Sequence, residues 1–415
     1  MSDLLVQPIG LLATCGGCGD AESKLGLVRD GAVLVQQGRI TYAGPAANAP
    51  RAPAGTPTID ARDRLVTPGF VDAHTHLVFA GERANEFAMR NRGATYLEIA
   101  NAGGGIASTV AATRAASEDA LVQLAHPRLQ RLLAQGVTTA EVKSGYGLAL
   151  EHELKMLRAI RRLDGEGPIQ LVATLLAAHA IPPELKTQRE LYVRACIDEI
   201  IPAVAEAKLA RFCDAFVEQS AFTADEARRI LGAAQARGLT PRLHVDQLTA
   251  GGGAELAAEL GAATADHLEH ISPQGIAALK KHDVSAVLVP TSTWFLRQPP
   301  YANGRALLDA GINVALGTNV NPGSAMSESM ALTLALACMH CGLSPAEALY
   351  AATAGGARAL QLDDRGRLQP GKRADLVVHA CRSVEHLPYH AAISHAEKVV
   401  VGGRVVLDAP VPFCD

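Results

Sequence analysis

Eight short apolar runs recur along the middle of the chain, and each is followed by a longer Ala-, Leu-, Arg- and Glu-rich stretch of helical period. The runs that we interpret as strands are residues 66–73, 137–143, 169–178, 212–218, 240–246, 263–268, 285–290 and 313–318. Eight strand–helix units in about 300 residues favour a (β/α)8 barrel over an open doubly wound sheet. The pattern therefore predicts an α/β protein built on a TIM-type barrel.

Polar residues gather where these predicted strands end. They are His74, Thr75, His76, Lys143, His179, Glu218, His244, His267 and Asn319. In such a barrel the carboxyl ends of the strands carry the chemistry. Histidines placed only for packing would not favour that edge repeatedly, so the pattern predicts an active site there.

Both ends of the chain show short strands separated by turns. The predicted strands are residues 26–28, 32–36 and 39–43 near the start and 375–379, 396–401 and 404–407 near the end, with a Gly402-Gly403 hairpin signal. We therefore expect residues 1–66 and 366–415 to form one composite β-sandwich domain. Residues 67–365 would form the barrel domain.

Composition and charge restrict the possible partners and the location. Acidic and basic residues nearly balance, at a formal charge of -4, which argues against a nucleic-acid or anionic-membrane partner. The longest apolar stretches fall far below the ~18 residues of a membrane span, and the first residues do not read as a signal peptide. We therefore expect a cytoplasmic protein that acts on a small molecule.

Two cysteine pairs have the two-residue spacing of a zinc knuckle, Cys15 with Cys18 and Cys338 with Cys341. The first pair lies in a Gly-rich segment and the second in an Ala/Leu helix pattern. Because a cytosolic chain of this size does not need disulfide bonds for its stability, we predict that all eight cysteines are reduced thiols.

His74 and His76 are candidate metal ligands. Side chains in a strand repeat every second residue, so both imidazoles face the same side. A pair of hydrogen-bonded histidines would give the same pattern, but His244 and Asn319 at other strand ends favour a metal. Three imidazoles suit zinc or iron and leave room for an oxygen ligand and a water molecule.

Several motifs resemble the amidohydrolase superfamily. Residues 67–76 (TPGFVDAHTH) resemble its signature, and residues 366–377 (GRLQPGKRADLV) resemble the segment that leads back into its small β domain. Within the superfamily the chain is similar to the imidazolonepropionase family in residues 103–106 (GGGI), 143–148 (KSGYGL), 178–180 (AHA), 244–247 (HVDQ), 266–269 (DHLE) and 321–324 (NPGS). This resemblance implies hydrolysis of 4-imidazolone-5-propanoate to N-formimidoyl-L-glutamate in histidine degradation, by a homodimer.

The resemblance also implies roles for single residues. One zinc or iron ion would be held by His74, His76, His244 and Asn319. His267 would assist proton transfer, and Gln247 would orient the ring or a water molecule. The implied substrate contacts are Arg83, Tyr146, His179, Gln247, Asn321, Gly323 and Ser324. Arg83 also lies in the loop after the first strand, so its position alone predicts a place at the rim of the site.

Asn319 departs from the family pattern, which has an aspartate at the end of the eighth strand. An amide cannot accept a proton as a carboxylate does, and its neutral charge weakens the affinity for a cation. The chain would then be an impaired hydrolase, natural or deliberately substituted, or Asp266 would take the role of base. The open alternatives are a metal-dependent deaminase of a cyclic amidine or nucleobase, and a ligand binder without turnover.

The three glycines 103–105 invite a second interpretation, as a phosphate-binding loop. No Gly-Lys-Ser/Thr follows them and no clear strand precedes them, which argues against phosphate. We expect a flexible loop near the site instead.

Overall fold

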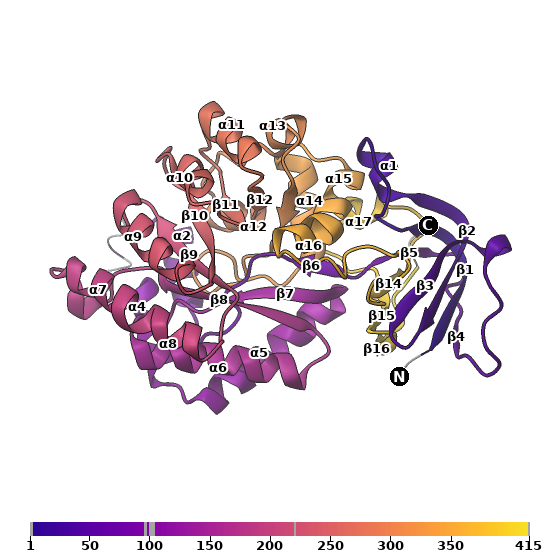
Figure 1. The fold of residues 1–415 in the computed structure, drawn as a ribbon, viewed down its shortest axis with the longest axis horizontal. Coiled ribbons are helices and arrows are strands. Elements are labelled where there is room, and N and C mark those ends of the chain that lie inside the picture. Colours follow the sequence, from indigo (N-terminus) through magenta and orange to yellow (C-terminus); the bar gives the residue numbers. More distant parts are fainter. Residues whose placement is uncertain (1–2, 95–97, 99–103, 220, 414–415) are drawn as a thin grey trace.

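The computed structural model describes residues 3–94, 98, 104–219 and 221–413 and divides their strands between two eight-stranded sheets (Figure 1). One sheet is all parallel, and its strands follow one another in sequence order. Its members are β6 (Phe70–Asp72), β7 (Val137–Lys143), β8 (Gln170–Ala178), β9 (Phe212–Val217), β10 (Thr240–Val245), β11 (Thr264–His267), β12 (Ser285–Leu288) and β13 (Val314–Leu316). The predicted barrel is confirmed.

The barrel is nearly closed by contacts between its first and last strands. Ala73 N donates to Leu316 O at 3.1 Å, and Asn319 N donates to His74 O at 2.9 Å. These bonds bring the ends of β6 and β13 side by side, although His74 and Asn319 lie far apart in sequence. Closure therefore places the predicted metal ligands of the first and eighth units together.

Helices cover the outside of the barrel (Figure 1). The longer ones are α2 (Ala84–Asn91), α4 (Ile106–Ala115), α5 (Glu118–Ala134), α6 (Leu150–Glu166), α9 (Ala224–Gln235), α11 (Pro273–Lys281) and α14 (Met330–His340). Shorter ones are α1 (Ala21–Leu25), α7 (Arg189–Ala195), α8 (Ile201–Glu206), α10 (Gly253–Glu259), α12 (Pro290–Leu296), α13 (Gly304–Asp309), α15 (Pro345–Tyr350), α16 (Gly356–Ala359) and α17 (His386–Tyr389). Short 3-10 helices occupy Ala46–Asn48 and Pro183–Leu185, and π-helical segments occupy Cys196–Ile200 and Ala351–Gly355.

Local sequence signals explain several helix starts. At α9 the Thr223 side chain accepts from the backbone of Glu226, whose carboxylate accepts in return from Thr223. Ser344 and Glu347 form the same capping box at α15. Such boxes satisfy backbone donors that a helix start leaves free. Within the described part of the chain, no helix is long and apolar enough to cross a membrane.

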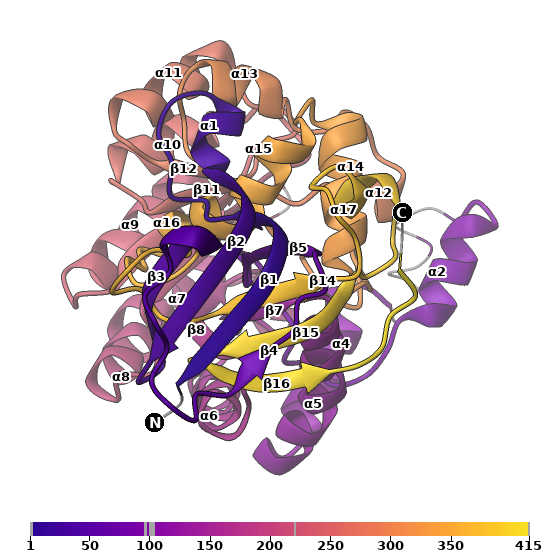
Figure 2. The ribbon, with the colours of Figure 1, turned by 90° about the vertical axis from the view of Figure 1, so that its right-hand side faces the viewer.

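The second sheet is mixed and combines strands from both ends of the chain (Figure 2). Its members are β1 (Leu4–Ala13), β2 (Leu27–Gln36), β3 (Arg39–Pro45), β4 (Thr58–Ile59), β5 (Leu65–Pro68), β14 (Leu376–His379), β15 (Ala396–Val401) and β16 (Arg404–Asp408). Strand β14 pairs antiparallel with β5, and this pairing joins the two chain ends. Apolar side chains from both halves, such as Val33, Val66 and Leu376, share one core. The predicted composite β unit is confirmed.

One predicted strand is split between the two sheets. Residues 66–73 were expected to be a single barrel strand, but β5 belongs to the terminal sheet and only β6 to the barrel. Gly69 lies at the crossing, where its backbone N donates to Asp375 O at 3.0 Å and a Cβ would collide with Thr138. Strand β5 spans the domain boundary that we propose between residues 66 and 67.

The first strands also differ from expectation. Strand β1 was missed because Pro8 and Gly10 look like strand breakers, but a register shift between Val6 and Ile9 accommodates Pro8. Residues 26–28 and 32–36 were expected as two strands around a turn. They form the single strand β2, in which Asp30 adopts a positive φ of 50°.

Seven cysteines lie in the described part of the chain, and six of them are free thiols: Cys15, Cys18, Cys196, Cys213, Cys338 and Cys341. Burial raises the pKa of Cys338 to about 11 and that of Cys341 to about 12, so both thiols stay protonated near neutral pH. The described cysteines belong to no cluster with metal-binding spacing. Cys414 lies outside the described residues.

Candidate metal centre and active site

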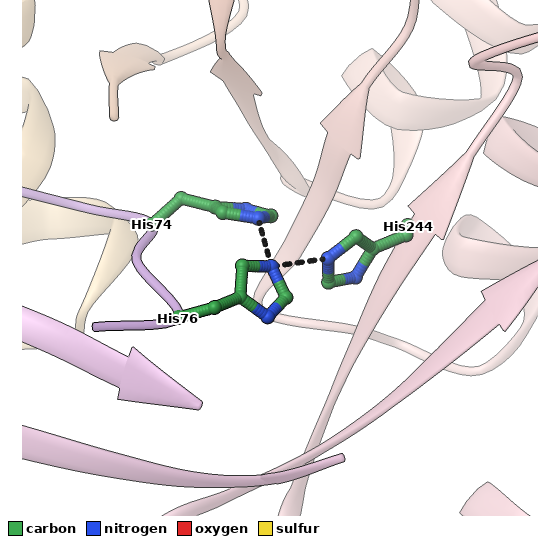
Figure 3. A group of neighbouring side chains, drawn as sticks. All are labelled: His74, His76 and His244. Carbon is green, nitrogen blue, oxygen red and sulfur yellow. Dashed lines mark hydrogen bonds between the residues drawn. The ribbon is translucent and has the colours of Figure 1, made fainter. Parts of the chain in front are cut away.

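Three histidines converge at the carboxyl end of the barrel (Figure 3). His76 Nε2 lies 3.2 Å from His74 Nε2 and 3.3 Å from His244 Nε2. All three side chains are buried, and within the described residues they form the only histidine, cysteine or carboxylate group with metal-binding spacing. The structure thus brings together the imidazoles of the first and fifth barrel strands.

Buried carboxylates orient two of these rings. His74 Nδ1 lies 2.7 Å from Asp266 Oδ2, and His244 Nδ1 lies 3.0 Å from Asp214 Oδ1. A carboxylate accepts hydrogen bonds, so each Nδ1 carries the proton and each Nε2 presents a lone pair. His76 Nε2 can donate a hydrogen bond to only one of the Nε2 atoms of His74 and His244. Lone pairs without a hydrogen-bond donor therefore remain directed toward the centre of the trio. This donor set fits a cation, and such a histidine–carboxylate pair is typical of metal ligands.

The protonation of the trio suits the same interpretation. Burial lowers the pKa of His74 and His76 well below the ordinary histidine value, and it also lowers that of His244. The neighbouring imidazoles and Lys143 act in the same direction. The histidines are therefore neutral near pH 7, as a metal ligand must be.

A cavity of about 300 Å³ opens above the trio. Its walls are His76, Tyr146, His179, Phe216, His244, Gln247, His267, Asn319, Asn321 and Ser324. Nine of these ten residues come from the sequence prediction. Phe216 was missed, although it lies two residues after Asp214 on β9 and therefore shares its inward face. That alternation was the available signal.

Tyr146 reaches the cavity from a loop after β7 that a buried carboxylate holds in place. Glu153 accepts from the backbone N of Gly145 at 3.1 Å, Gly147 at 2.8 Å and Leu148 at 2.8 Å. From the other side, Arg114 donates to Gly147 O at 2.6 Å. The tyrosine therefore sits at the tip of a doubly anchored turn, a feature that the sequence did not reveal.

His179 packs against this turn and over the histidine trio. Its Nδ1 lies 3.0 Å from Gly145 O, and its ring stacks on His76 with centroids 5.3 Å apart. Burial, together with His244, lowers the pKa of His179 to about 4. The ring is therefore neutral near pH 7, and it donates from Nδ1 to the carbonyl and leaves Nε2 as an acceptor.

His267 lies on the opposite side of the trio. Its ring centroid is 5.6 Å from that of His74 and 5.4 Å from that of His244. Its Nδ1 is 3.4 Å from Glu269 Oε1, which also accepts from Thr293. His267 and Asn319 both adopt positive φ, at 82° and 55°. Such strained backbone concentrates at functional sites.

Asn319 and Asn321 lie on one tightly bonded loop after β13. Asn321 Nδ2 donates to Asn319 O at 2.7 Å and to Ser324 Oγ at 2.8 Å, and its Oδ1 accepts from the backbone of Gly323 and Ser324. The amide of Asn321 is thus already used to shape the loop. Asp72 holds the loop start through Thr318 Oγ1 at 2.6 Å.

Arg83 and Gly323 lie beside the cavity, outside its walls. The guanidinium of Arg83 pairs with Glu86 through Nε at 2.8 Å and Nη2 at 2.7 Å. Its Nη1 lies against Gly323, where a Cβ would collide with it. Glu86 Oε1 also accepts from Gly105 N at 2.9 Å, which ties Arg83 to the start of α4. Glu86 was not predicted, because its helix pattern resembles an ordinary surface helix.

Asp266 and the Gly-rich segment complete the predicted positions. Asp266 is buried behind His74 rather than in the cavity wall, and its Oδ2 bonds to His74 and Arg242. A carboxylate so placed does not reach a substrate. Gly103 lies outside the described residues, so the loop expected there is seen only from Gly104 onward.

Comparison with known proteins identifies the family. The amidohydrolase family profile matches residues 65–406. The chain belongs to the amidohydrolase family. It is 60% identical to an imidazolonepropionase of Myxococcus xanthus over 99% of both chains. It is 46% identical to an imidazolonepropionase of Geobacillus kaustophilus, over 98% of this chain and 99% of the relative.

Solved structures share the fold at low identity. A mutant of atrazine chlorohydrolase from Arthrobacter aurescens, complexed with zinc and atraton, matches with a TM-score of 0.75 and 18% identity, over 98% of this chain and 96% of that one. A 5-methylcytosine deaminase from Klebsiella pneumoniae matches with a TM-score of 0.74 and 20% identity, over 99% of both chains. Together with the family match, the predicted resemblance and hydrolase class are confirmed.

Proposed function

We propose that the chain is an imidazolonepropionase, which hydrolyses 4-imidazolone-5-propanoate to N-formimidoyl-L-glutamate in histidine degradation. The observation that carries the proposal is the convergence of three imidazole lone pairs on a small polar cavity. The full-length identity of 60% to an imidazolonepropionase supports the choice of substrate. The deaminase alternative has support only from the shared fold, so we do not pursue it.

The metal would be one zinc or iron ion held by His74, His76 and His244, with the amide oxygen of Asn319 as a further neutral ligand. When bound, such an ion supplies a Lewis acid for the lactam carbonyl and acidifies a water molecule. The buried carboxylates Asp214 and Asp266 hold the imidazoles of His74 and His244 in place, and this would present their Nε2 atoms to such an ion.

Proton transfer falls to residues of the cavity wall. We assign His267 as the group that takes a proton from the attacking water and returns one to the leaving ring nitrogen. Glu269 would orient its ring. Gln247 would hold the ring or the water by hydrogen bonds. Asp266 is a poor alternative base, since it lies behind His74 and is already bonded to two partners.

Substrate recognition falls to the rim. We assign the propionate carboxylate to Arg83, with Tyr146 and His179 as neighbouring donors. Asn321, Gly323 and Ser324 would shape the far wall and offer hydrogen bonds to the glutamate-like part of the product. Because Glu86 already pairs with two nitrogens of Arg83, the substrate would meet its remaining Nη1 face.

Asn319 favours a second candidate function, a ligand-binding protein that has the same pocket but does not turn the ligand over. Its amide lines the cavity where the family pattern has an aspartate. The two candidates share ligand and fold and differ only in product formation.

One experiment separates these candidates. The metal content of the purified chain is measured together with the ultraviolet loss of imidazolonepropionate, for the parent and for Asn319→Asp. Metal and turnover in both forms support the enzyme. Metal and ligand binding without product in the parent support the binder, and absence of both metal and ligand binding contradicts the proposal.

A cytoplasmic location and a homodimer also belong to this proposal. Sedimentation equilibrium of the purified chain tests the dimer, with a mass near twice 43.3 kDa as the expected result. A monomer mass at micromolar concentration would contradict it.

A further inference from the structure

A layer of five charged side chains lies directly beneath the metal-binding histidines. They are Glu141, Lys143, Asp214, Arg242 and Asp266, and each is fully buried. Burying so many charges is costly unless they are paired. We call this group the buried charge layer. Its residues come from four barrel strands, β7, β9, β10 and β11.

Lys143 is the member that touches all three carboxylates. Its Nζ donates to Asp214 Oδ2 at 2.8 Å and to Glu141 Oε1 at 3.0 Å, and it lies 3.5 Å from Asp266 Oδ2. Asp214 in turn orients His244, and Asp266 orients His74. One ammonium group therefore contacts both carboxylates that fix the outer metal ligands.

We infer that Lys143 is a positioning residue that couples His74 to His244 and so sets the geometry of the metal site. The inference rests on the metal site proposed above. Glu141 extends the coupling to the middle of the His74–His76 segment, because its Oε2 accepts from Thr75 N at 3.3 Å. The coupling acts through hydrogen bonds, and Lys143 itself does not line the cavity.

A purely electrostatic role and a positioning role of Lys143 predict opposite effects of its removal on the affinity for a divalent ion. The buried charge layer holds three carboxylates and two cations. Removing a cation makes the layer more negative, and Coulomb attraction would then strengthen the binding of a divalent ion. Losing the shared partner instead frees Asp214 and Asp266 to turn away from their histidines. Loss of such outer partners typically weakens metal binding ~10–100-fold.

The test is a Co²⁺ titration of metal-free protein, followed by calorimetry and by the visible absorption of the bound cobalt. The variants are Lys143→Met and the double variant Glu141→Gln with Lys143→Met. The double variant removes one charge of each sign, so the net charge of the layer equals that of the parent. It keeps the inference testable where the single variant fails to fold.

A matched control is Arg365→Met. Arg365 is also buried, but it bonds to Asp364, Thr139 and Gln170 near the opposite ends of β7 and β8. Its loss should lower the stability without altering the cobalt affinity or spectrum. Any change seen only in the Lys143 variants therefore reports on the metal site.

We expect both Lys143 variants to bind Co²⁺ ~10–100-fold more weakly than the parent, with an altered visible spectrum. Equal or tighter binding with an unchanged spectrum would overturn the role of Lys143 and leave the metal site intact. A parent chain that binds no Co²⁺ would instead overturn the metal site itself, and this inference with it.

Discussion

In the barrel, His74 and His76 turn their Nε2 atoms toward each other at 3.2 Å, whereas in the terminal sheet His379 directs its Nε2 to the hydroxyl of Thr67 at 2.9 Å. All three rings are buried, and burial lowers the pKa of each. The Thr67 hydroxyl donates a hydrogen bond to Pro68 O, so it accepts a hydrogen bond from His379. His379 is thus a satisfied structural histidine.

The histidines of the trio differ from the core histidine in their hydrogen-bond partners. The histidines in both sheets are buried and neutral. The difference is that Asp266 and Asp214 accept hydrogen bonds from Nδ1 of His74 and His244, so that the Nε2 lone pairs of these rings point toward one another. Acceptors behind the ring and an unsatisfied nitrogen in front of it together distinguish the candidate metal site from the core histidine.

The largest expected effect comes from returning a carboxylate to the barrel end. Asn319→Asp should raise turnover of imidazolonepropionate by ~10²–10⁴, because a positioned proton acceptor is worth about that factor. Metal retention should rise as well. The measurement is the single-turnover rate at matched metal occupancy.

A control adds the same charge elsewhere. Asn303→Asp, at the N-cap of α13, keeps the hydrogen bond to Ala306 N and lies outside the cavity wall. It should leave the rate unchanged. Equal rates for the parent and Asn319→Asp would mean that residue 319 does not stand at a catalytic position.

The second-largest effect is expected from replacing Arg83 at the rim of the site. Arg83→Ala should weaken binding of imidazole-4-propanoate by ~2–4 kcal/mol, because a charge-assisted contact to the carboxylate is lost. Arg83→Lys should restore part of the affinity. Titration calorimetry measures both, and the exposed Arg92→Ala serves as the control. Parent-like affinity in Arg83→Ala would make Arg83 a structural partner of Glu86 alone.

A smaller effect should come from the terminal sheet. Burial lowers the pKa of His379 to about 3, so the folded state binds no proton there between pH 6.5 and 4 while the unfolded chain does. Its stabilising contribution is therefore complete above pH 6.5 and is lost as the pH falls. One such histidine lowers the free energy of unfolding by about 2 kcal/mol when the pH falls from 7 to 5.

His379→Gln keeps a donor for Thr67 without a titrating ring. Chemical denaturation at pH 7 and pH 5 should show a smaller acid loss of unfolding free energy in this variant than in the parent. Identical losses would mean that His379 does not contribute to the acid sensitivity.

The barrel could be predicted from strand periodicity, whereas the resemblance to a known family supplied much of the cavity wall, including Tyr146, Gln247, Asn321 and Ser324. Strand periodicity located the ends at which His244 and His267 lie. It could not predict that Gly69 switches the chain between sheets, since that depends on pairing between β5 and the distant β14. It also missed the anchor Glu153, whose partners become neighbours only after the loop folds.

The buried charge layer was missed for a related reason. Lys143 was noted at a strand end, but its sequence neighbours do not reveal that Asp214 and Asp266 will surround it. A charged residue inside an apolar strand, such as Asp214 within β9, is the signal that the sequence did contain.

The assignment of the histidine trio as a metal site can be tested by the metal stoichiometry of three forms of the chain, the parent, His76→Ala and His379→Gln. Each is titrated with Zn²⁺ after removal of all metal. We expect one tightly bound ion per chain in the parent and in His379→Gln, and none in His76→Ala. A tightly bound ion that survives His76→Ala, or a parent that binds none, would contradict this assignment.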